Sequence, residues 1–283
     1  DCMKQKLPST PGPIGVFDSG YGGLTILDKI RGLMPEYDYI YLGDSARCPY
    51  GPRSFEVVYE FTLQAVSKLF ELGCPLVILA CNTASAKALR TIQQINLPVI
   101  DATRRVLGVI RPTAECIGEI TRSRHVGILA TAGTIKSESY LLEIHKLSPD
   151  IVVTGEACPM WVSLVENNEY QSEGADYFVK QHINRLLDKD PMIDTIILGC
   201  THYPLLLDKI RQFTPGHIRI IAQGEYVARS LQDYLNRHPE MDARCEKGGK
   251  CRFLTTESEN KFEESASIFL GRQDIKVESI ALE

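Results

Sequence analysis

The chain has 283 residues, of which 44% are hydrophobic and 24% charged, and its formal net charge is -5 at pH 7. This length suits two domains of about 100–150 residues each, with the composition of an ordinary globular protein. The negative charge argues against an electrostatic grip on nucleic acid or an anionic membrane, and no apolar run approaches the roughly 20 residues that span a bilayer.

The N-terminal segment, residues 1–10, is polar and lacks the apolar core of a secretory signal. The nine cysteines are an odd number and are scattered along the chain. A small secreted domain built on disulfides would show a different pattern. We therefore expect a cytoplasmic protein with mostly free thiols.

Short β-branched apolar runs alternate with helical patterns along the chain. The clearest helix spans residues 55–72, where apolar side chains recur every three or four positions until Gly73 and Pro75. Alternating strands and helices predict parallel, doubly wound α/β sheets, which bind ligands at the carboxyl ends of their strands. The predicted strands are residues 14–17, 37–42, 76–80, 125–130, 151–154, 195–198 and 217–222.

The two halves of the chain contain matching segments. Residues 14–20 match residues 126–132 at an offset of 112, and residues 79–83 match residues 198–202 at an offset of 119. Two shorter matches, Gly-Asp with Gly-Glu and Cys-Pro with Cys-Pro, pair residues 43–44 with 155–156 and 48–49 with 158–159. Four matches in one order predict two related halves, which would present Cys81 and Cys200 to a shared cleft from opposite sides.

A pair of opposed thiols can invert a stereocentre, because one removes a proton and the other returns one to the opposite face. The pKa of a thiol, about 8.5, falls when the sulfur lies at a helix N-terminus. Cys81 and Cys200 both follow apolar strands and precede apparent helix starts, and Pro204 suits a first helical turn. One such cysteine alone is more typical of a buried structural residue. The matched pair favours catalysis.

The glycine-rich loop 18–23 follows the first strand and could hold a carboxylate with its N–H groups. A dinucleotide-binding loop is the rival interpretation, but the G-x-G-x-x-G spacing is absent. Asp18 could instead be a helix N-cap. His202 could move protons for Cys200, although a lone histidine is more often structural. Glu166 carries no signal beyond that of a surface carboxylate.

Zinc is the competing use of cysteine and histidine. The spacing of Cys200 and His202 is wrong for a zinc finger, and no C-x-x-C occurs in the chain. Cys245 and Cys251, near His238, give only a weak metal signal. No lysine near these loops is a candidate for pyridoxal phosphate. We therefore expect neither a metal nor a cofactor.

Together these segments resemble the glutamate racemase family, which makes D-glutamate for bacterial peptidoglycan. The resemblance covers about residues 14–271, and its combination of motifs is highly specific. The segments are GVFDSGYGGLT (15–25), YLGDSARCPYG (41–51), ACNTAS (80–85), ATAGT (130–134), ACP (157–159), LVE (164–166), GCTHYP (199–204) and the tail from FLTT (253–256) to FLG (269–271).

The resemblance implies that Cys81 and Cys200 are the acid–base residues, with Asp18, Glu166 and His202 as supporting polar groups. It implies no pyridoxal phosphate, metal or nucleotide, and glutamate as the small-molecule partner, with no nucleic acid or membrane. A homodimer is a candidate assembly. The implied substrate contacts are Asp18, Ser19, Tyr50, Gly51, Asn82, Thr83, Thr131 and Thr201.

The resemblance also implies two pseudo-symmetric α/β domains, each a mostly parallel sheet flanked by helices, with the active site in the cleft between them. The expected domains are residues 1–107 with 222–283, and residues 108–221. The alternatives are an aspartate racemase or other two-cysteine racemase, and a non-catalytic binding protein on this scaffold. Either would keep the fold and change the activity.

Three departures from the family pattern stand out. Ser45 replaces a common threonine and keeps the hydroxyl. Residues 101–107 look like an insertion, and Arg111 follows where an acidic residue is usual. Gln223, after Ala222, replaces the serine of a common Asp-Ser pair. The last two lie near the predicted connections between domains, so we expect them to affect domain packing rather than the site.

Overall fold

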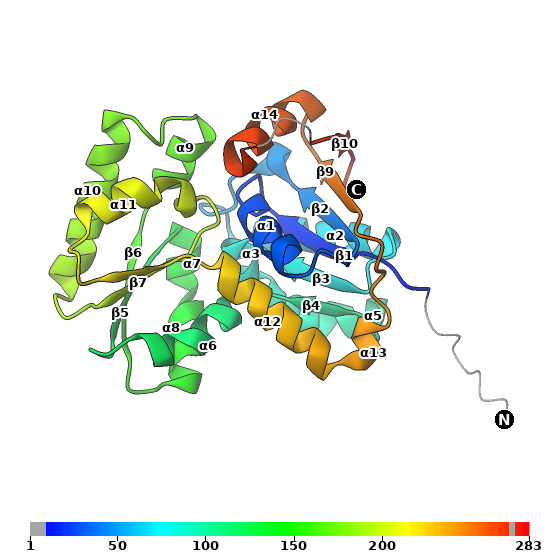
Figure 1. Ribbon diagram of the computed structural model, residues 1–283, viewed down its shortest axis with the longest axis horizontal. Coiled ribbons are helices and arrows are strands. Elements are labelled where there is room, and N and C mark those ends of the chain that lie inside the picture. The colour runs from blue at the N-terminus through cyan, green and yellow to red at the C-terminus, as the bar shows by residue number, and fades with distance from the viewer. Residues whose placement is uncertain (1–9, 272–274, 283) are drawn as a thin grey trace.

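A computed structural model of the chain describes residues 10–271 and 275–282, and the polar segment 1–9 lies outside these ranges. The described residues form two parallel sheets flanked by helices (Figure 1). This arrangement confirms the predicted fold class. Within the described ranges, no helix combines the length and the apolar character needed to cross a membrane.

The larger sheet has six strands in the order β10-β9-β2-β1-β3-β4, and all its pairs are parallel. Every residue of β1, β2 and β3 is buried, because helices cover both faces of a parallel sheet. The strands are β1 (Ile14–Asp18), β2 (Tyr39–Gly43), β3 (Leu76–Leu79), β4 (Arg105–Leu107), β9 (Cys251–Thr255) and β10 (Val277–Ser279).

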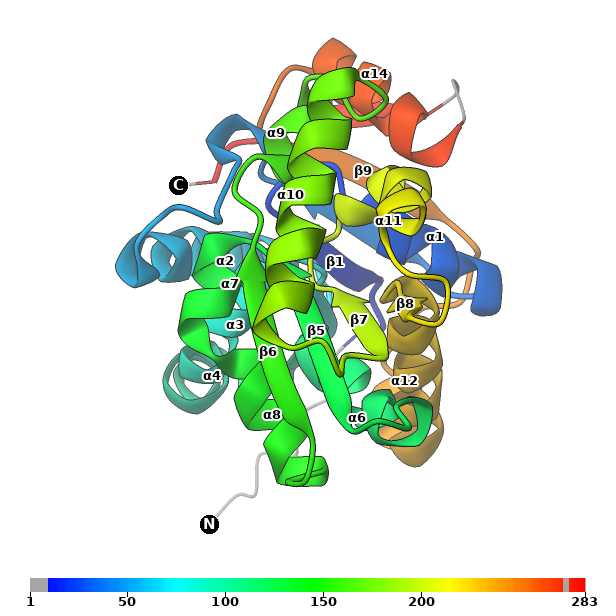
Figure 2. The ribbon, with the colours of Figure 1, turned by 90° about the vertical axis from the view of Figure 1, so that its left-hand side faces the viewer.

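The smaller sheet has four parallel strands in the order β6-β5-β7-β8. Figure 2 shows it from its outer side. Its order repeats that of β2-β1-β3-β4 in the larger sheet, which confirms the two related halves. The strands are β5 (His125–Ala130), β6 (Val152–Ala157), β7 (Thr195–Leu198) and β8 (Arg219–Ile221).

The strand register supports one part of the predicted repeat and corrects another. Gly15 lies opposite Val77, and Gly127 lies opposite Ile196, so the offsets of 112 and 119 are structural equivalences. However, Gly43 lies opposite Asp18 while Ala157 lies opposite Ala130. The structural partner of residue 43 is therefore 157, so the match of 43–44 with 155–156 is wrong by two residues. It paired similar residue types without regard to register. The match of 48–49 with 158–159 lies beyond the paired strands and stays a prediction.

The segment 101–107, which looks like an insertion in the sequence, contributes a strand to the larger sheet. Arg105–Leu107 is the edge strand β4, with Arg105 opposite Leu76. Two arginines obscure the apolar pattern, because an edge strand can expose charged side chains. The chain returns after β8 to add β9 and β10 beside β2. The domain boundaries at 107/108 and 221/222 stay a prediction.

The helix predicted at residues 55–72 forms, with one error of detail. Ser54 caps α2 (Phe55–Glu71) by accepting a hydrogen bond from Val57 N, and Gly73, with φ of 96°, follows its end. Phe55 was placed on the apolar face but is 47% exposed, because it lies in the first turn. The helix α12 (Gly224–Arg237) packs on both α1 (Leu24–Leu33) and α6 (Ile110–Ile120), so it joins the two halves (Figure 1).

The remaining α-helices are α3 (Asn82–Lys87), α4 (Leu89–Thr91), α5 (Leu97–Ile100), α7 (Ala132–Ser137), α8 (Ser139–Leu147), α9 (Trp161–Glu166), α10 (Glu173–Lys189), α11 (Leu207–Phe213), α13 (Pro239–Asp242) and α14 (Glu259–Leu270). Short 3-10 helices span Ser45–Arg47 and Tyr203–Leu206, and a π-helical segment spans Ile92–Asn96. Apolar side chains of β1 alternate between the two faces of the larger sheet. Ile14 and Val16 join one core cluster and Phe17 joins the other.

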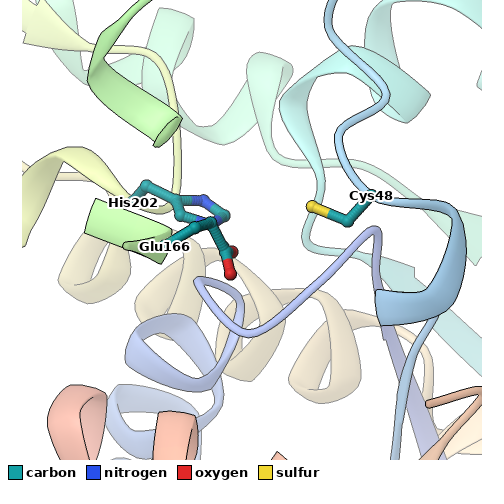
Figure 3. A group of neighbouring side chains, drawn as sticks. All are labelled: Cys48, Glu166 and His202. Atoms are coloured by element: carbon teal, nitrogen blue, oxygen red, sulfur yellow. The ribbon is translucent and has the colours of Figure 1, made fainter. Parts of the chain in front are cut away.

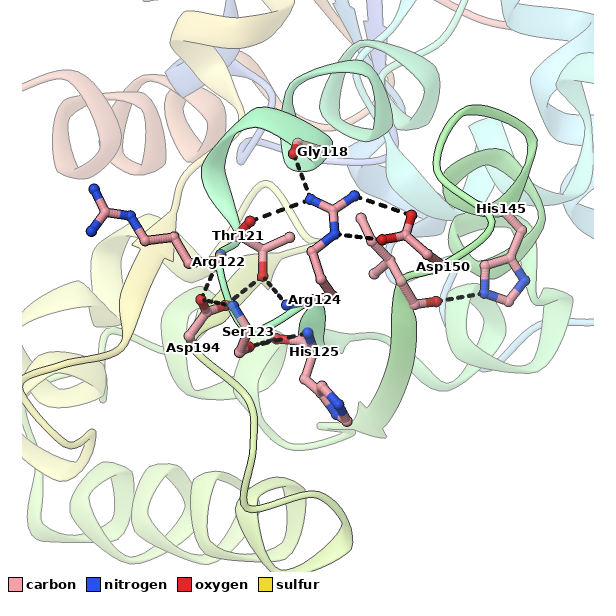
Figure 4. A network of polar contacts seen from close by, with 10 residues as sticks. Gly118, Thr121, Arg122, Ser123, Arg124, His125, His145, Asp150 and Asp194 are labelled. Carbon is pink, nitrogen blue, oxygen red and sulfur yellow. Dashed lines mark hydrogen bonds and ion pairs between the residues drawn. The ribbon is translucent and has the colours of Figure 1, made fainter.

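A polar network fixes the loop before β5 (Figure 4). Asp194 accepts hydrogen bonds from the backbone N–H groups of Arg122 and Ser123, both at 2.8 Å. Desolvation raises the pKa of Asp194, but the hydrogen bonds outweigh it and hold the pKa below its usual value. Arg124, whose φ is 65°, makes a two-pronged ion pair with Asp150 at 2.7 and 3.1 Å. Because this network lies at the amino ends of the strands, it supports the sheet rather than a ligand site.

Candidate active site

A small cavity lies where the carboxyl ends of the central strands of the two sheets face each other. Its volume is about 20 Å³, room for a single water molecule, so the structure shows a closed cleft. Asp18 and Glu166 are not among the lining residues, although the other predicted site residues are. The cavity is lined by Ser19, Cys48, Pro49, Tyr50, Gly51, Cys81, Asn82, Thr83, Thr131, Val162, Cys200, Thr201 and His202.

Cys81 occupies the N-terminus of α3, as the sequence predicts. Its Sγ accepts a hydrogen bond from Ala84 N at 3.4 Å and lies 3.5 Å from Ser19 Oγ. The side chain is only 5% exposed. Burial, together with the nearby Asp18 carboxylate, raises the pKa of Cys81 to about 12. The expectation of a lowered pKa is therefore wrong for Cys81 in the closed cleft, because desolvation outweighs the helix terminus.

Cys200 occupies the equivalent position in the second sheet. Gly199 N donates to Leu129 O, as Ala80 N donates to Phe17 O directly before Cys81. The chain then enters the 3-10 turn Tyr203–Leu206 instead of the predicted α-helix, with Pro204 in its first turn. Cys200 is 7% exposed, so both thiols are buried in the closed cleft.

A histidine and a carboxylate stand behind Cys200. His202 Nδ1 lies 4.0 Å from the Cys200 sulfur, and His202 Nε2 is hydrogen-bonded to Glu166 Oε1. Although desolvation acts in the opposite direction, the hydrogen bonds with Cys200 and Glu166 raise the pKa of His202 to about 10. The raised pKa favours a protonated His202 ring, which lies between the Cys200 sulfur and the Glu166 carboxylate.

Asp18 organises the loop that follows β1. Its Oδ2 accepts hydrogen bonds from Gly23 N at 2.8 Å and Gly20 N at 3.3 Å. These N–H groups therefore bind Asp18 itself. They are not available to a ligand carboxylate, so the predicted use of this loop is wrong for these two groups. Burial raises the pKa of Asp18, although the charge of His202 lowers it. Its Oδ1 is buried without a hydrogen-bond partner among the described residues, which leaves an acceptor for a ligand amine.

Direct contacts between the halves close the cleft. Thr83 Oγ1, from α3, lies 2.9 Å from Thr131 Oγ1, which precedes α7. Gly133 N donates to Gly51 O at 3.1 Å. A side chain at Gly51 would also collide with Thr131, since an added Cβ would lie 2.9 Å from the threonine Cβ. A ligand larger than water must therefore separate these groups to enter.

A buried amide network behind Cys81 was not predicted from the sequence. Asn82 Nδ2 donates to Gln223 Oε1 at 2.7 Å, and Gln223 Nε2 donates to Asn82 Oδ1 at 3.1 Å. Gln223 Nε2 also contacts Thr113 Oγ1 and the Tyr140 hydroxyl, which donates to Asn82. The network brings together segments 141 residues apart, so no local pattern could reveal it. Gln223 was noted only as a departure from the family pattern.

We expect Tyr140→Phe to lower the free energy of unfolding by about 1–3 kcal/mol, because it leaves buried polar groups of Asn82 and Gln223 with fewer partners. Urea denaturation followed by circular dichroism measures this change. Tyr177→Phe is the matched control, since Tyr177 is exposed and its ring packs against Phe178. Equal stability of the two variants would show that the network contributes nothing.

Three potential metal ligands meet at the edge of the cavity. Cys48, Glu166 and His202 offer ligand atoms that all lie within 4.8 Å of one another (Figure 3). Among the described residues, the weak signal from Cys245, Cys251 and His238 does not correspond to such a group. Cys48 lies in the segment 41–51 that resembles the family, but no pattern in the sequence assigns it a role.

Comparisons with known proteins agree with this geometry. A model of the Asp/Glu/Hydantoin racemase family matches residues 25–231. The chain is 38% identical over 270 residues to a glutamate racemase of Ruegeria sp. (strain TM1040), covering 92% of this chain and 97% of the relative. It is 39% identical over 271 residues to a glutamate racemase of Bacillus cereus, covering 95% and 97% of the two chains.

Solved structures show the same similarity in three dimensions. The crystal structure of the glutamate racemase isoform RacE1 from Bacillus anthracis superposes with a TM-score of 0.86 at 36% identity, covering 96% of this chain and 98% of that one. A glutamate racemase from Francisella tularensis, crystallised with D-glutamate, gives a TM-score of 0.84 at 31% identity, with coverages of 98% and 99%.

Proposed function

The chain belongs to the Asp/Glu/hydantoin racemase family, and we propose that it is a glutamate racemase that moves protons between Cys81, the substrate α-carbon and Cys200. The single observation that carries the mechanism is the equivalence of the two thiols. Each lies two residues after the corresponding central strand, and both line one cavity. The similarity to glutamate racemases over nearly the whole chain supports glutamate as the substrate.

In the direction from L- to D-glutamate, the Cys200 thiolate removes the α-proton, so a C–H bond breaks and an S–H bond forms. The electron pair stays on the substrate as a carbanion, and the Cys81 thiol delivers its proton to the opposite face. Two features of the closed site support these roles. His202, whose pKa is raised, lies beside the Cys200 sulfur, and the raised pKa of Cys81 keeps that thiol protonated. The reverse reaction exchanges the two roles.

Polar groups around the thiols suit an amino acid with two carboxylates. The unpartnered Oδ1 of Asp18 can accept a hydrogen bond from the substrate ammonium group. The hydroxyl groups of Ser19, Thr83, Thr131 and Thr201 line the cavity and can donate to carboxylates. Because the closed cavity is too small for glutamate, we propose that the halves separate to admit the substrate and close again around it, which excludes water during proton transfer.

Asn82 is an expected substrate contact, but its side chain is already engaged within the protein. Its carboxamide is held by Gln223 and Tyr140, so we propose that Asn82 contacts the substrate mainly through its backbone N–H at the start of α3. The proposed setting is the cytoplasm, in keeping with free thiols, and the proposed assembly is a homodimer. The D-glutamate formed would supply peptidoglycan.

The decisive test is turnover by purified protein after exhaustive dialysis against a chelator, without pyridoxal phosphate. We expect the circular dichroism of L-glutamate and of D-glutamate to decay to zero, because the two enantiomers have equal free energy. Activity that returns only with zinc or pyridoxal phosphate would contradict the cofactor-free mechanism. Faster turnover of aspartate would favour the aspartate racemase alternative, and binding without turnover would favour the non-catalytic protein.

A further inference from the structure

The cluster of Cys48, Glu166 and His202 is not required by the proposed proton transfer, although His202 and Glu166 serve it. The three side chains come from separate segments: the turn after β2, the end of α9 and the loop after β7. Their ligand atoms converge, and the sulfur of Cys48 points toward the imidazole and the carboxylate (Figure 3). A thiol, an imidazole and a carboxylate form a ligand set that suits Zn²⁺.

The spacing of the cluster is close to what zinc requires. With metal–ligand distances of about 2.0–2.3 Å, the ligand atoms of a tetrahedral site lie roughly 3.4–3.6 Å apart. The three atoms here lie within 4.8 Å of one another, so a metal requires Cys48 to approach while the hydrogen-bonded atoms of His202 and Glu166 move apart. The Glu166 side chain is partly exposed and can adjust its rotamer.

Gly20 lies directly beside two of the three ligand atoms. A Cβ added to Gly20 would lie 3.0 Å from the Cys48 sulfur and 3.4 Å from Glu166 Oε1. A side chain at position 20 would therefore crowd both ligand atoms, and glycine leaves them uncovered. Cys48 and His202 are buried or half-buried in loops that follow strands, whereas Glu166 lies at the end of α9.

We propose that Cys48, Glu166 and His202 form a binding site for one Zn²⁺ ion, which holds the cleft closed. The ion would link Cys48 of the first half to Glu166 and His202 of the second. It would replace the protons on the thiol and the imidazolium, since thiolate and neutral imidazole are the ligand forms. A water molecule would take the fourth position.

The effect on catalysis rests on the proposed function. With zinc on Nε2, the metal replaces the hydrogen bond between His202 and Glu166, so the histidine beside Cys200 is held by the ion. The link through Cys48 also opposes the opening that admits the substrate. Zinc should therefore inhibit racemisation reversibly, and a chelator should restore the original rate.

Binding is tested first, without reference to activity. We expect calorimetric titration of chelator-treated protein with ZnCl₂ to give one site per chain, weakened at least tenfold in Cys48→Ser. Cys116→Ser is the matched control, because Cys116 is a partly buried thiol outside the cavity. With Co²⁺ as the probe, the thiolate-to-metal absorption band should be lost in Cys48→Ser and kept in Cys116→Ser. Unchanged binding in Cys48→Ser would overturn the proposal.

X-ray absorption of the zinc-loaded native chain keeps the test valid even if Cys48→Ser folds poorly. One sulfur and two or three nitrogen or oxygen ligands are expected, whereas two sulfurs would place zinc on the catalytic thiols and overturn the site. Inhibition is scored against the metal-free rate of each variant. Native protein that racemises glutamate but binds no zinc contradicts this inference alone. Protein that binds zinc through Cys48 but never racemises glutamate contradicts the proposed function alone.

Discussion

Replacing either Cys81 or Cys200 with alanine should lower kcat/KM for racemisation by about 10²–10⁴-fold, the range expected for loss of a positioned acid or base. Each thiol is needed in both directions, as the base for one enantiomer and the acid for the other. The double variant should therefore be little worse than either single variant, because the pair acts as one unit. Polarimetric rates from both enantiomers measure the effect.

Isotope exchange distinguishes two bases from one. During the first turnover of L-glutamate in deuterated water, the D-glutamate product should carry deuterium while recovered L-glutamate stays largely protiated. This follows because Cys200 removes the proton and a different group, Cys81, supplies the solvent-derived deuteron. A single base working on both faces would return the original proton or label both pools.

Cys116→Ala is the control for the loss of a thiol as such, and it should racemise at the native rate. Its side chain lies on α6, outside the cavity. Substantial two-way turnover by Cys200→Ala would return Cys200 to the status of a buried structural residue. Thermal unfolding of each variant, followed by circular dichroism, separates loss of chemistry from loss of fold.

Replacing His202 with glutamine should lower kcat/KM by about 10²-fold, since the variant loses the cation that stabilises the Cys200 thiolate. Glu166→Gln should have a smaller effect, about tenfold, because the imidazole stays in place but loses its charged partner. The loss in kcat/KM must be equal for the two enantiomers, because their equilibrium constant is one. A difference between the two enantiomers should instead appear in the primary isotope effect.

In His202→Gln, the primary isotope effect should differ between the two enantiomers. With proton transfer at Cys200 slowed, α-deuterated L-glutamate should show a larger isotope effect than α-deuterated D-glutamate, and the native protein should show less difference. A purely structural role for His202 would not produce this inequality. Equal isotope effects in His202→Gln would contradict the assignment of His202 to Cys200.

His182→Gln provides the matched control. His182 is buried and its Nδ1 lies 2.7 Å from Glu156 Oε2, so it forms a similar histidine–carboxylate pair. It does not line the cavity. We expect this variant to lose stability while keeping the isotope effects of the native protein.

Much of the fold could be predicted from the sequence, because parallel strands and amphipathic helices impose local periodicity. The predicted bounds of β5 and β7 agree with the structure residue for residue. The edge strand β4 was harder, since its outer residues meet solvent and need no apolar pattern, and Arg105–Leu107 was taken for part of an insertion. No strand was predicted at β9 or β10, where the family resemblance placed only the tail in the first domain.

The sequence by itself determined the position of Cys81 and Cys200. Repeated motifs at fixed offsets require equivalent places in equivalent halves, and the register places both thiols two residues beyond paired strands. The roles of Asp18, Glu166 and His202 entered through resemblance, since each is an ordinary residue type in its local context.

Only the tertiary structure decided the electrostatics and the closure of the site. Burial raised the pKa of Cys81 where its place at a helix terminus predicted a fall, because desolvation depends on everything that surrounds the sulfur. The partnership of Glu166 with His202, the network around Gln223 and the convergence on Cys48 join segments that are remote in the chain. Such contacts arise from the packing of separate segments within and between the two halves, and no periodicity along one segment encodes them.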